Sequence, residues 1–348
     1  MRVASLLKST FPIVARCSGL GSALALRYRA LRYRGAGTIF MLHSVVDCGD
    51  DYPDHSLRCP AETLTAALTW LREAGVDFVS LDEMLERLIA PSERPFAAFT
   101  FDDGFADSLT HALPVMERFN APMTVYVATG MILRSMDAWW LGLAAWIRAN
   151  DRIALPAAGL AFDCADPAGK KRAFVAIEAV IHHNYELLPN VRAAIAAQGI
   201  YSDSLVDREA LTIAQLRELS RHPLVTIGGH GDTHINLARA SDDTAYREMM
   251  SNRRFLEELI GRPVEHFAYP FGNARACGNR EAEFARSVGF RTAVTTRSGA
   301  VFPAHLDHPY ALPREVLSAN DTPSSLRCKL DGVYRAIQSQ LGDPIALM

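Results

Sequence analysis

Two adjacent carboxylates, Asp102 and Asp103, follow an apolar run at 96–99 in the stretch TFDDGFAD. Side chains alternate along a β-strand, so the two acids should diverge unless the chain bends, and Gly104 supplies a bend. Buried unpaired charge costs several kcal/mol, whereas a bound cation would let one acid act as a ligand and the other as a proton acceptor. A turn whose aspartates cap the next helix is the simpler interpretation of this stretch alone.

A pair of histidines, His230 and His234, lies in GGHGDTHINL, just after the apolar run at 224–227. On a helical turn this spacing would place both imidazoles on one face, where they can share a metal ion. HxxxH alone is equally typical of two structural histidines. Both the histidines and the DDG acids follow expected strands, however, and α/β folds gather catalytic groups at strand carboxyl ends. Two histidines and one carboxylate form a metal site with positions open for water and substrate.

The elements that must position these groups alternate between strand and helix patterns. Expected strands lie at 37–46, 76–79, 95–104, 121–129, 224–231, 264–272 and 290–296, and expected helices at 60–75, 80–90, 107–120, 212–223, 242–261 and 279–289. Such alternation predicts an α/β protein with a parallel sheet and helices outside it. About seven units favour a (β/α) barrel, complete or incomplete, over a small open sheet.

The interval at about 136–210 breaks this rhythm. It reads as two helical segments, 137–150 and 170–199, with no intervening strand of note, and predicts a helical insertion. Its tryptophans, Trp139, Trp140 and Trp146, could form a platform for a sugar ring. Trp139 and Trp146 are seven residues apart, however, which favours a core stripe of the insertion.

Composition excludes some classes of protein. With 49% hydrophobic and 22% charged residues and a net charge of −3, the 348-residue chain is typical of a globular protein without the basic surplus of a nucleic-acid binder. Its six cysteines contain no CxxC pair, which favours free thiols in a reducing compartment.

The N-terminal segment, 1–36, combines apolar residues with a basic cluster (Arg27, Arg29, Arg32, Arg34), but Arg16 interrupts the apolar stretch. Its apolar run is shorter than the roughly 18 residues of a membrane span. We expect an amphipathic helical leader on a cytoplasmic protein, packed on the domain or in peripheral contact with a membrane. We place the barrel at 37–325, interrupted by the insertion, and a helical tail at 326–348.

A third motif, FAYPFGNA at 267–274, ends another expected strand with a tight aromatic turn. TFDDG, HGDTH and AYPFG, in this order, with YALPRE (310–315) as a weaker fourth, resemble the polysaccharide deacetylases with a NodB-homology domain, carbohydrate esterase family 4. The resemblance spans roughly residues 38–318 apart from the insertion. It implies a distorted (β/α) barrel and hydrolysis of N-acetyl, sometimes O-acetyl, groups on an N-acetylated oligo- or polysaccharide such as a chitooligosaccharide.

The resemblance also implies roles for individual residues. Asp102 corresponds to the catalytic base, and Asp103, His230 and His234 correspond to the ligands of a divalent metal. This donor set suits zinc, although iron, cobalt and nickel also fit it. The turn formed by Tyr269, Pro270 and Phe271 corresponds to the substrate and oxyanion region, with a backbone N–H near Tyr269 as the expected donor.

The sequence departs from the family pattern at several positions. Gly231 stands where the family commonly has a hydroxyl residue, and Ala268 stands where it commonly has an arginine that pairs with the base. We expect Arg314 to replace that arginine.

The usual late L-x-x-H, which supplies the protonating histidine, is not evident after Arg314. We expect His43 to serve as the acid because it ends the first strand, with His305 and His308 as alternatives. The remaining histidines are expected to be surface or packing residues: His55, His111, His182, His183, His222 and His266.

Two other functions fit these motifs. The missing arginine and late histidine would suit a non-catalytic carbohydrate-binding barrel, although a binder has no need for two costly adjacent acids. A hydrolase of a non-sugar C–N bond, such as a cyclic amide, would retain both aspartates of the DDG stretch and both histidines of the HxxxH pair.

Overall fold

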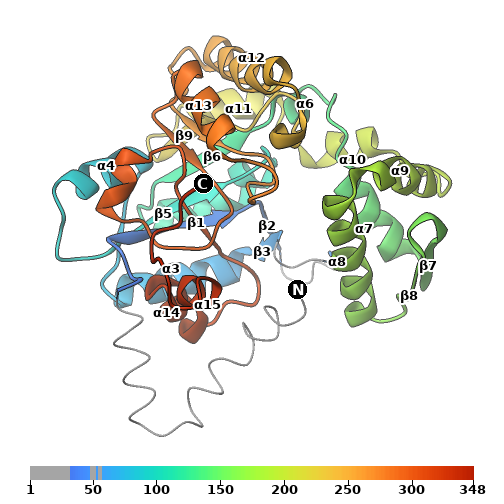
Figure 1. The fold of residues 1–348 in the computed structure, drawn as a ribbon, viewed down its shortest axis with the longest axis horizontal. Coiled ribbons are helices and arrows are strands. Elements are labelled where there is room, and N and C mark those ends of the chain that lie inside the picture. Colours follow the sequence, from blue (N-terminus) through green and yellow to red (C-terminus); the bar gives the residue numbers. More distant parts are fainter. Residues whose placement is uncertain (1–31, 48–51, 54–56) are drawn as a thin grey trace, which may run out of the picture.

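The computed structural model describes residues 32–47, 52–53 and 57–348, so nearly all of the predicted N-terminal leader lies outside the described residues. The described chain forms a barrel-like body and a smaller helical unit beside it (Figure 1). We use the term helical unit for residues 139–209, from the start of α7 to the end of α10.

An eight-stranded sheet forms the centre of the larger body, and all of its strand pairs are parallel. Its order is β11-β10-β9-β6-β5-β1-β12, with β4 beside the start of β5. The strands are β1 (Gly37–Leu42), β4 (Asp77–Phe78), β5 (Phe96–Phe101), β6 (Met123–Val127), β9 (Val225–Gly229), β10 (His266–Ala268), β11 (Thr292–Val294) and β12 (Glu315–Val316). The predicted α/β class and distorted (β/α) barrel are confirmed.

The segment before β12 spans the gap between the two ends of the sheet. Leu312 forms a parallel bridge with Val294 in β11, and three residues later Glu315 pairs with Phe40 in β1. Arg314 lies between these two attachments. The curled sheet is therefore closed by a short piece of chain that carries a single buried arginine.

Helices cover the outside of the sheet. They are α3 (Ala61–Glu73), α4 (Leu81–Ile89), α5 (Leu113–Arg118), α11 (Ile213–Ser220), α12 (Asp242–Ile260) and α13 (Asn279–Val288). Amphipathic spacing explains their packing: Leu64, Leu68 and Leu71 form the buried stripe of α3. The Ser241 side chain caps the first turn of α12, and Gly261 ends that helix in the left-handed conformation.

The single strand expected at 37–46 is wrong, because the chain forms two strands that belong to different sheets. After β1, His43 interrupts the pairing, and β2 (Ser44–Val46) pairs instead with β3 (Arg58–Pro60). The break leaves His43 at the carboxyl end of β1.

The helical unit contains α7 (Trp139–Ala149), α8 (Pro167–His183), α9 (Leu188–Ala196) and α10 (Ser202–Glu209) around its own apolar core. Contrary to expectation, an antiparallel hairpin, β7 (Arg152–Leu155) and β8 (Leu160–Asp163), joins α7 to α8. A 3-10 turn, η2 (Pro156–Ala158), and Gly159 with φ +63° connect its strands. Trp146 packs in this core.

The remaining elements are short. They are η1 (Ser108–Ala112), a π-helical turn before α5, and α6 (Thr129–Ile132), η3 (Tyr185–Leu187), η4 (Leu237–Arg239), η5 (Pro303–Asp307), α14 (Pro323–Leu330) and α15 (Val333–Gln338). The last two helices pack beside α3 (Figure 1). No helix in the described ranges is both long and apolar enough to cross a bilayer.

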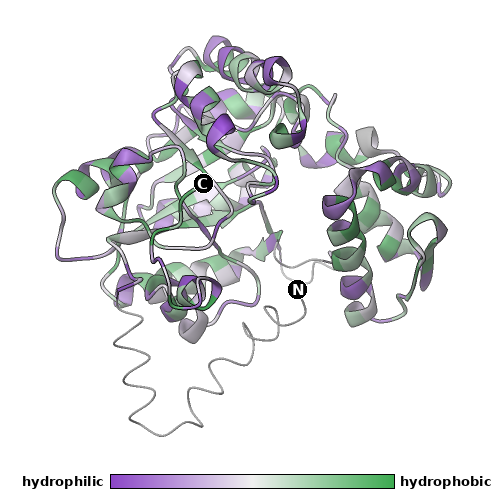
Figure 2. Cartoon of the chain, viewed as in Figure 1, coloured by the Kyte–Doolittle hydropathy of each residue, from purple (hydrophilic) through white to green (hydrophobic). Residues whose placement is uncertain are grey.

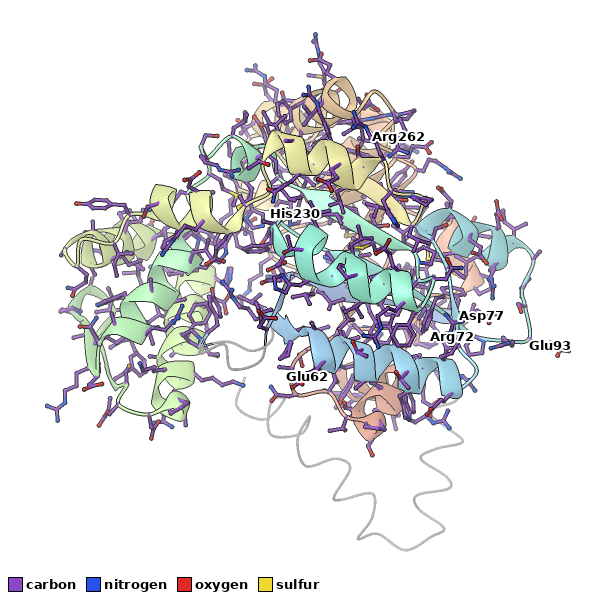
Figure 3. All side chains as sticks on the ribbon, turned by 180° about the vertical axis from the view of Figure 1, so that it is seen from behind. Glu62, Arg72, Asp77, Glu93, His230 and Arg262 are labelled. Carbon is purple, nitrogen blue, oxygen red and sulfur yellow. The ribbon has the colours of Figure 1, made fainter. Side chains whose placement is uncertain are left out.

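Hydropathy follows this architecture. The central strands are hydrophobic, whereas hydrophilic residues gather on the outer faces of α12 and α13 (Figure 2). From behind, the charged residues Glu62, Arg72, Glu93 and Arg262 lie on the outer surface, and His230 lies on the side of the barrel that faces the helical unit (Figure 3). The carboxyl ends of the strands therefore open toward the helical unit.

Candidate active site

The turn after β5 directs both aspartates into one site. Asp102 continues the alternate row of Ala98 and Thr100, while Asp103 has φ +75°. The Gly104 N–H donates to the Asp102 carbonyl at 3.0 Å and closes a three-residue turn around Asp103. Because this turn reverses the direction of Asp103, the two acids do not diverge as they would on a regular strand.

Asp102 forms a bidentate ion pair with Arg314. Both guanidinium nitrogens donate to the carboxylate at 2.7 Å, and both residues are at most 2% exposed. The guanidinium also donates to the Thr100 hydroxyl and the Thr295 carbonyl. Burial raises the pKa of Asp102, but the charge and hydrogen bonds of Arg314, together with the nearby imidazoles of His230 and His43, outweigh burial and lower the pKa overall. The structure therefore places Arg314 where the resemblance requires a substitute arginine.

Asp103 lies between the two histidines. Its Oδ1 atom is 3.3 Å from Nε2 of His230 and 3.3 Å from Nε2 of His234. One ligand atom from each residue lies within 4.8 Å of the others, and all three residues are buried. Burial raises the pKa of Asp103, but the contacts with the imidazoles hold the pKa well below its usual range. The carboxylate therefore remains charged at neutral pH.

The loop between the two histidines is not the helical turn expected from HxxxH. Both Gly231 (φ +81°) and His234 (φ +57°) adopt left-handed conformations. Glu248 of α12 holds the loop by accepting hydrogen bonds from the Asp232 and Thr233 backbone N–H groups at 2.9 and 2.8 Å. Gly231, a departure from the family pattern, suits a backbone angle that other residues adopt at a cost.

A second set of contacts orients His230. Its Nδ1–H donates to the Ala268 carbonyl at 2.7 Å, so Nε2 is the ring nitrogen that faces Asp103. The Asn252 side chain accepts from the His230 backbone N–H and donates to the Val127 carbonyl, so it ties β9 to β6. Such orientation of a metal-ligating imidazole through its other nitrogen is usual in metal sites.

These residues fit a divalent metal. Oδ1 of Asp103 is buried without a hydrogen-bond donor in the described part of the chain, although it belongs to an ionised group. Burial lowers the pKa of His234, which favours the neutral imidazole that ligation requires. A buried carboxylate in contact with two imidazole nitrogens is the donor set of an open catalytic metal site.

The aromatic turn after β10 narrows the choice of a backbone donor near Tyr269. The Tyr269 N–H donates to the Val294 carbonyl in the sheet, and its hydroxyl donates to the Tyr310 carbonyl, so the N–H of Tyr269 itself is not free. Pro270 has no N–H and packs near Gly231. The Phe271 N–H makes no hydrogen bond to any described residue, and Phe271 lines the pocket with φ +62°.

The three candidate acids lie in different places. His43 lines the same pocket as Asp102 and Asp103, and its Nδ1 is buried without a partner among the described residues. His305 instead bonds to Phe302 and Ala346, and His308 lines a separate depression near the C-terminus. The structure therefore excludes the two alternatives from the site, and only His43 remains beside the acids.

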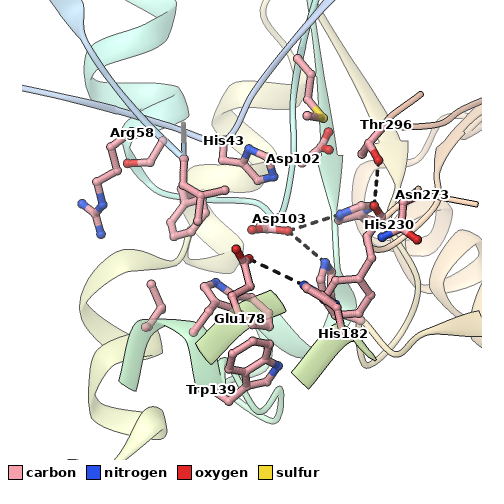
Figure 4. A pocket seen from close by; sticks show the side chains of 18 of the residues that line it. His43, Arg58, Asp102, Asp103, Trp139, Glu178, His182, His230, Asn273 and Thr296 are labelled. Carbon is pink, nitrogen blue, oxygen red and sulfur yellow. Dashed lines mark hydrogen bonds and ion pairs between the residues drawn. The ribbon is translucent and has the colours of Figure 1, made fainter. Parts of the chain in front are cut away.

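One cavity of about 200 Å³ is lined by both aspartates, His230, His234 and His43 (Figure 4). Part of its wall comes from the helical unit: Trp139, Trp140, Leu141, Glu178 and His182. His182 packs against the rings of Trp139, Tyr185 and Phe271, in keeping with the expected packing role, and it also lines the cavity, which was not expected. Its spacing of four from Glu178 on one face of α8 was a signal in the sequence, but nothing there showed that this face meets the barrel.

Comparisons with known proteins agree on one family. The sequence pattern described as polysaccharide deacetylase matches residues 179–293. YxkH of Bacillus subtilis (strain 168), named as a polysaccharide deacetylase, is 30% identical over 265 residues, which cover 75% of this chain and 65% of YxkH. The poly-beta-1,6-N-acetyl-D-glucosamine N-deacetylase of Escherichia coli (strain K12) is 23% identical over 308 residues, 80% of this chain and 36% of the relative.

A solved structure, the Streptococcus pyogenes deacetylase PplD in complex with acetate, aligns with a TM-score of 0.56 at 18% identity. The alignment covers 84% of this chain and 97% of PplD, and supports the barrel fold. By contrast, the chain spans less than two thirds of the length of the two sequence relatives, 65% of one and 36% of the other.

The metal site generates the first prediction. His230→Ala should abolish stoichiometric binding of a divalent ion because it removes one of three protein ligands. Elemental analysis of purified protein and circular dichroism should show lost metal and retained fold. His222→Ala, on a histidine just before β9 rather than after it, is the matched control and should keep the metal. Wild-type metal content in His230→Ala would contradict the assignment.

Proposed function

We propose that this chain, which belongs to the polysaccharide deacetylase family, is a metal-dependent hydrolase that removes N-acetyl groups from an N-acetylated glycan. One observation carries the proposal: a buried Asp–His–His set lies next to a second aspartate that is paired with a buried arginine. A non-catalytic barrel would have no use for this arrangement of adjacent buried acids, which is costly to maintain.

We propose zinc as the metal, held by Asp103, His230 and His234. When bound, such an ion polarises the acetyl carbonyl and makes water more acidic. Asp102 accepts the proton of the attacking water as the new C–O bond forms. Although Arg314 binds both of its oxygens, each carboxylate oxygen retains a further lone pair for that proton.

The remaining groups complete the reaction. The Phe271 N–H is the nearest candidate donor for the developing oxyanion, because the Tyr269 N–H is committed to the sheet. His43 donates a proton to the departing nitrogen as the C–N bond breaks, so the products are acetate and a sugar amine. Its unpartnered position beside the two acids supports this role.

The substrate proposal draws on both the pocket and the relatives. The Escherichia coli relative is named for poly-beta-1,6-N-acetyl-D-glucosamine, and the pocket combines aromatic walls with polar side chains.

A cytoplasmic location and membrane contact through the N-terminal segment remain predictions from the sequence, because nearly all of that segment lies outside the described residues.

The activity itself is testable by acetate release from N-acetylglucosamine oligomers. We expect release that a chelator abolishes and added zinc restores, because the site depends on a divalent ion. An O-acetylated sugar and a cyclic imide serve as comparison substrates. Absence of acetate from every metal-loaded reaction, or hydrolysis of the imide alone, would contradict the proposal.

A second test separates the two aspartates. Asp102→Asn should retain the metal and the fold but lose about 10²- to 10⁴-fold in kcat, since only the proton acceptor is removed. Metal analysis and steady-state kinetics on the same preparation measure both properties. If Asp102→Asn loses its metal instead, the roles of Asp102 and Asp103 must be exchanged.

A third test concerns Arg314, whose charge lowers the pKa of Asp102. The base works deprotonated, so raising its pKa moves the acid limb of the pH–rate profile to higher pH. Arg314→Ala should shift that limb upward by about 1 to 3 pH units, and Arg314→Lys should shift it less. Arg254→Ala, an exposed arginine on α12, is the control.

Arg314→Ala also leaves a buried carboxylate unpaired, which typically costs about 3–5 kcal/mol of folding free energy. Thermal unfolding should therefore be measured together with the kinetics. If the Arg314→Ala variant does not fold, the shift of the acid limb is measured on Arg314→Lys instead. An unchanged acid limb in a folded Arg314 variant would show that Asp102 is not the titrating base.

A further inference from the structure

We propose that the helical unit forms the binding site for one sugar residue, so that the enzyme deacetylates the terminal unit of a glycan and not its internal units. The inference rests on the proposed function and concerns which part of the substrate enters the site. It follows from the size of the cavity, its walls and the way in which the helical unit is attached.

The cavity is small for a polymer site. Its volume of about 200 Å³ includes the space beside the metal ligands. Pockets for drug-sized ligands usually measure about 300–1,000 Å³, so this one suits a single sugar ring with its acetyl group. Internal units of a chain need neighbouring subsites on both sides of the metal, and a cavity of this volume, as the described residues line it, holds one ring.

Aromatic rings from α7 form the wall opposite the barrel. Trp140 lies with its ring centre 5.0 Å from that of His234, and Trp139 packs against Trp140 at 5.9 Å. Both tryptophans line the cavity although they are less than 9% exposed. A sugar that presents its acetyl group to the metal ligands therefore lies beside aromatic rings, which suit its apolar C–H face.

Polar side chains from α8 complete this wall. Glu178 lies 3.7 Å from Nε2 of His182, and the His182 ring is 5.1 Å from that of Phe271. Both line the cavity, and Figure 4 shows them below Asp103 and His230. The catalytic steps above use neither residue. Their carboxylate and imidazole can accept and donate hydrogen bonds to the hydroxyls of one sugar ring.

The helical unit is tied to the barrel on both sides of the cavity. On one side the Tyr52 hydroxyl donates to the Trp140 carbonyl at 3.5 Å, and the Ala106 N–H donates to the Glu209 carbonyl at 2.8 Å. On the other side Arg275 contacts Nδ1 of His183 at 3.1 Å. A glycan that ran through the site would have to displace one of these ties, whereas a chain end can enter from the open mouth.

The experiment uses the full, zinc-loaded chain and N-acetylglucosamine monomers to hexamers with β-1,4 or β-1,6 linkages and a label at the reducing end. Tandem mass spectrometry locates the free amine in each product. We expect one acetyl group lost per oligomer, always from a terminal unit and independently of length. Amines at internal units, or several amines per chain, would overturn the inference.

Binding provides a readout that does not depend on turnover. Saturation-transfer NMR with the same oligomers should place the strong protein contacts on one terminal sugar. If no oligomer releases acetate, the proposed function fails, and this measurement still decides the inference: contacts on one end support it, and contacts spread along the chain contradict it.

Glu178→Gln tests the wall contributed by α8. Loss of a charged hydrogen bond to a sugar hydroxyl should raise KM about tenfold with kcat little changed. Glu186→Gln, an exposed glutamate that follows α8 in η3, is the matched control and should behave as wild type. An unchanged KM for Glu178→Gln, with unchanged NMR contacts, would show that α8 does not bind the substrate.

Discussion

The structure depends on how it accommodates two adjacent negative charges at the buried end of β5. Asp102 and Asp103 are 2% and 4% exposed, and burial alone raises the pKa of both. The fold compensates each charge differently. Arg314 neutralises Asp102 through two hydrogen bonds, whereas Asp103 has only two imidazoles and the metal ion that we propose. The difference between these partners separates the roles of two chemically identical side chains.

The site also requires strained backbone conformations, which cost folding free energy. Asp103, His234 and Phe271 all have positive φ, which costs non-glycine residues of order 1–3 kcal/mol each. Each lies at the end of a strand or in the loop that follows it, and each lines the same cavity. Closure of the barrel is also needed to neutralise Asp102. The segment from Leu312 to Glu315 joins the two ends of the sheet, and it holds Arg314 in contact with Asp102.

Local signals in the sequence predicted much of this arrangement. Alternation of strands and helices indicated the barrel, and strand-end placement brought the DDG acids, the histidine pair and Arg314 together. Features that depend on contacts between distant segments were missed. Nothing local in the sequence showed that the Tyr269 N–H is bonded to β11, the neighbour of β10, or that α8 docks on the barrel so that His182 lines the cavity as well as packing. The positive φ of Gly231 was readable as a glycine preference, but the HxxxH spacing favoured a helix.

The central claim is that the two aspartates divide the work, Asp103 as ligand and Asp102 as base. A crystal structure of the zinc-loaded protein with an anomalous difference map tests it most directly. The account predicts a zinc ion about 2.0–2.2 Å from Asp103, His230 and His234, with Asp102 still bound by Arg314. A zinc ion bound by Asp102, or located away from these histidines, would contradict it.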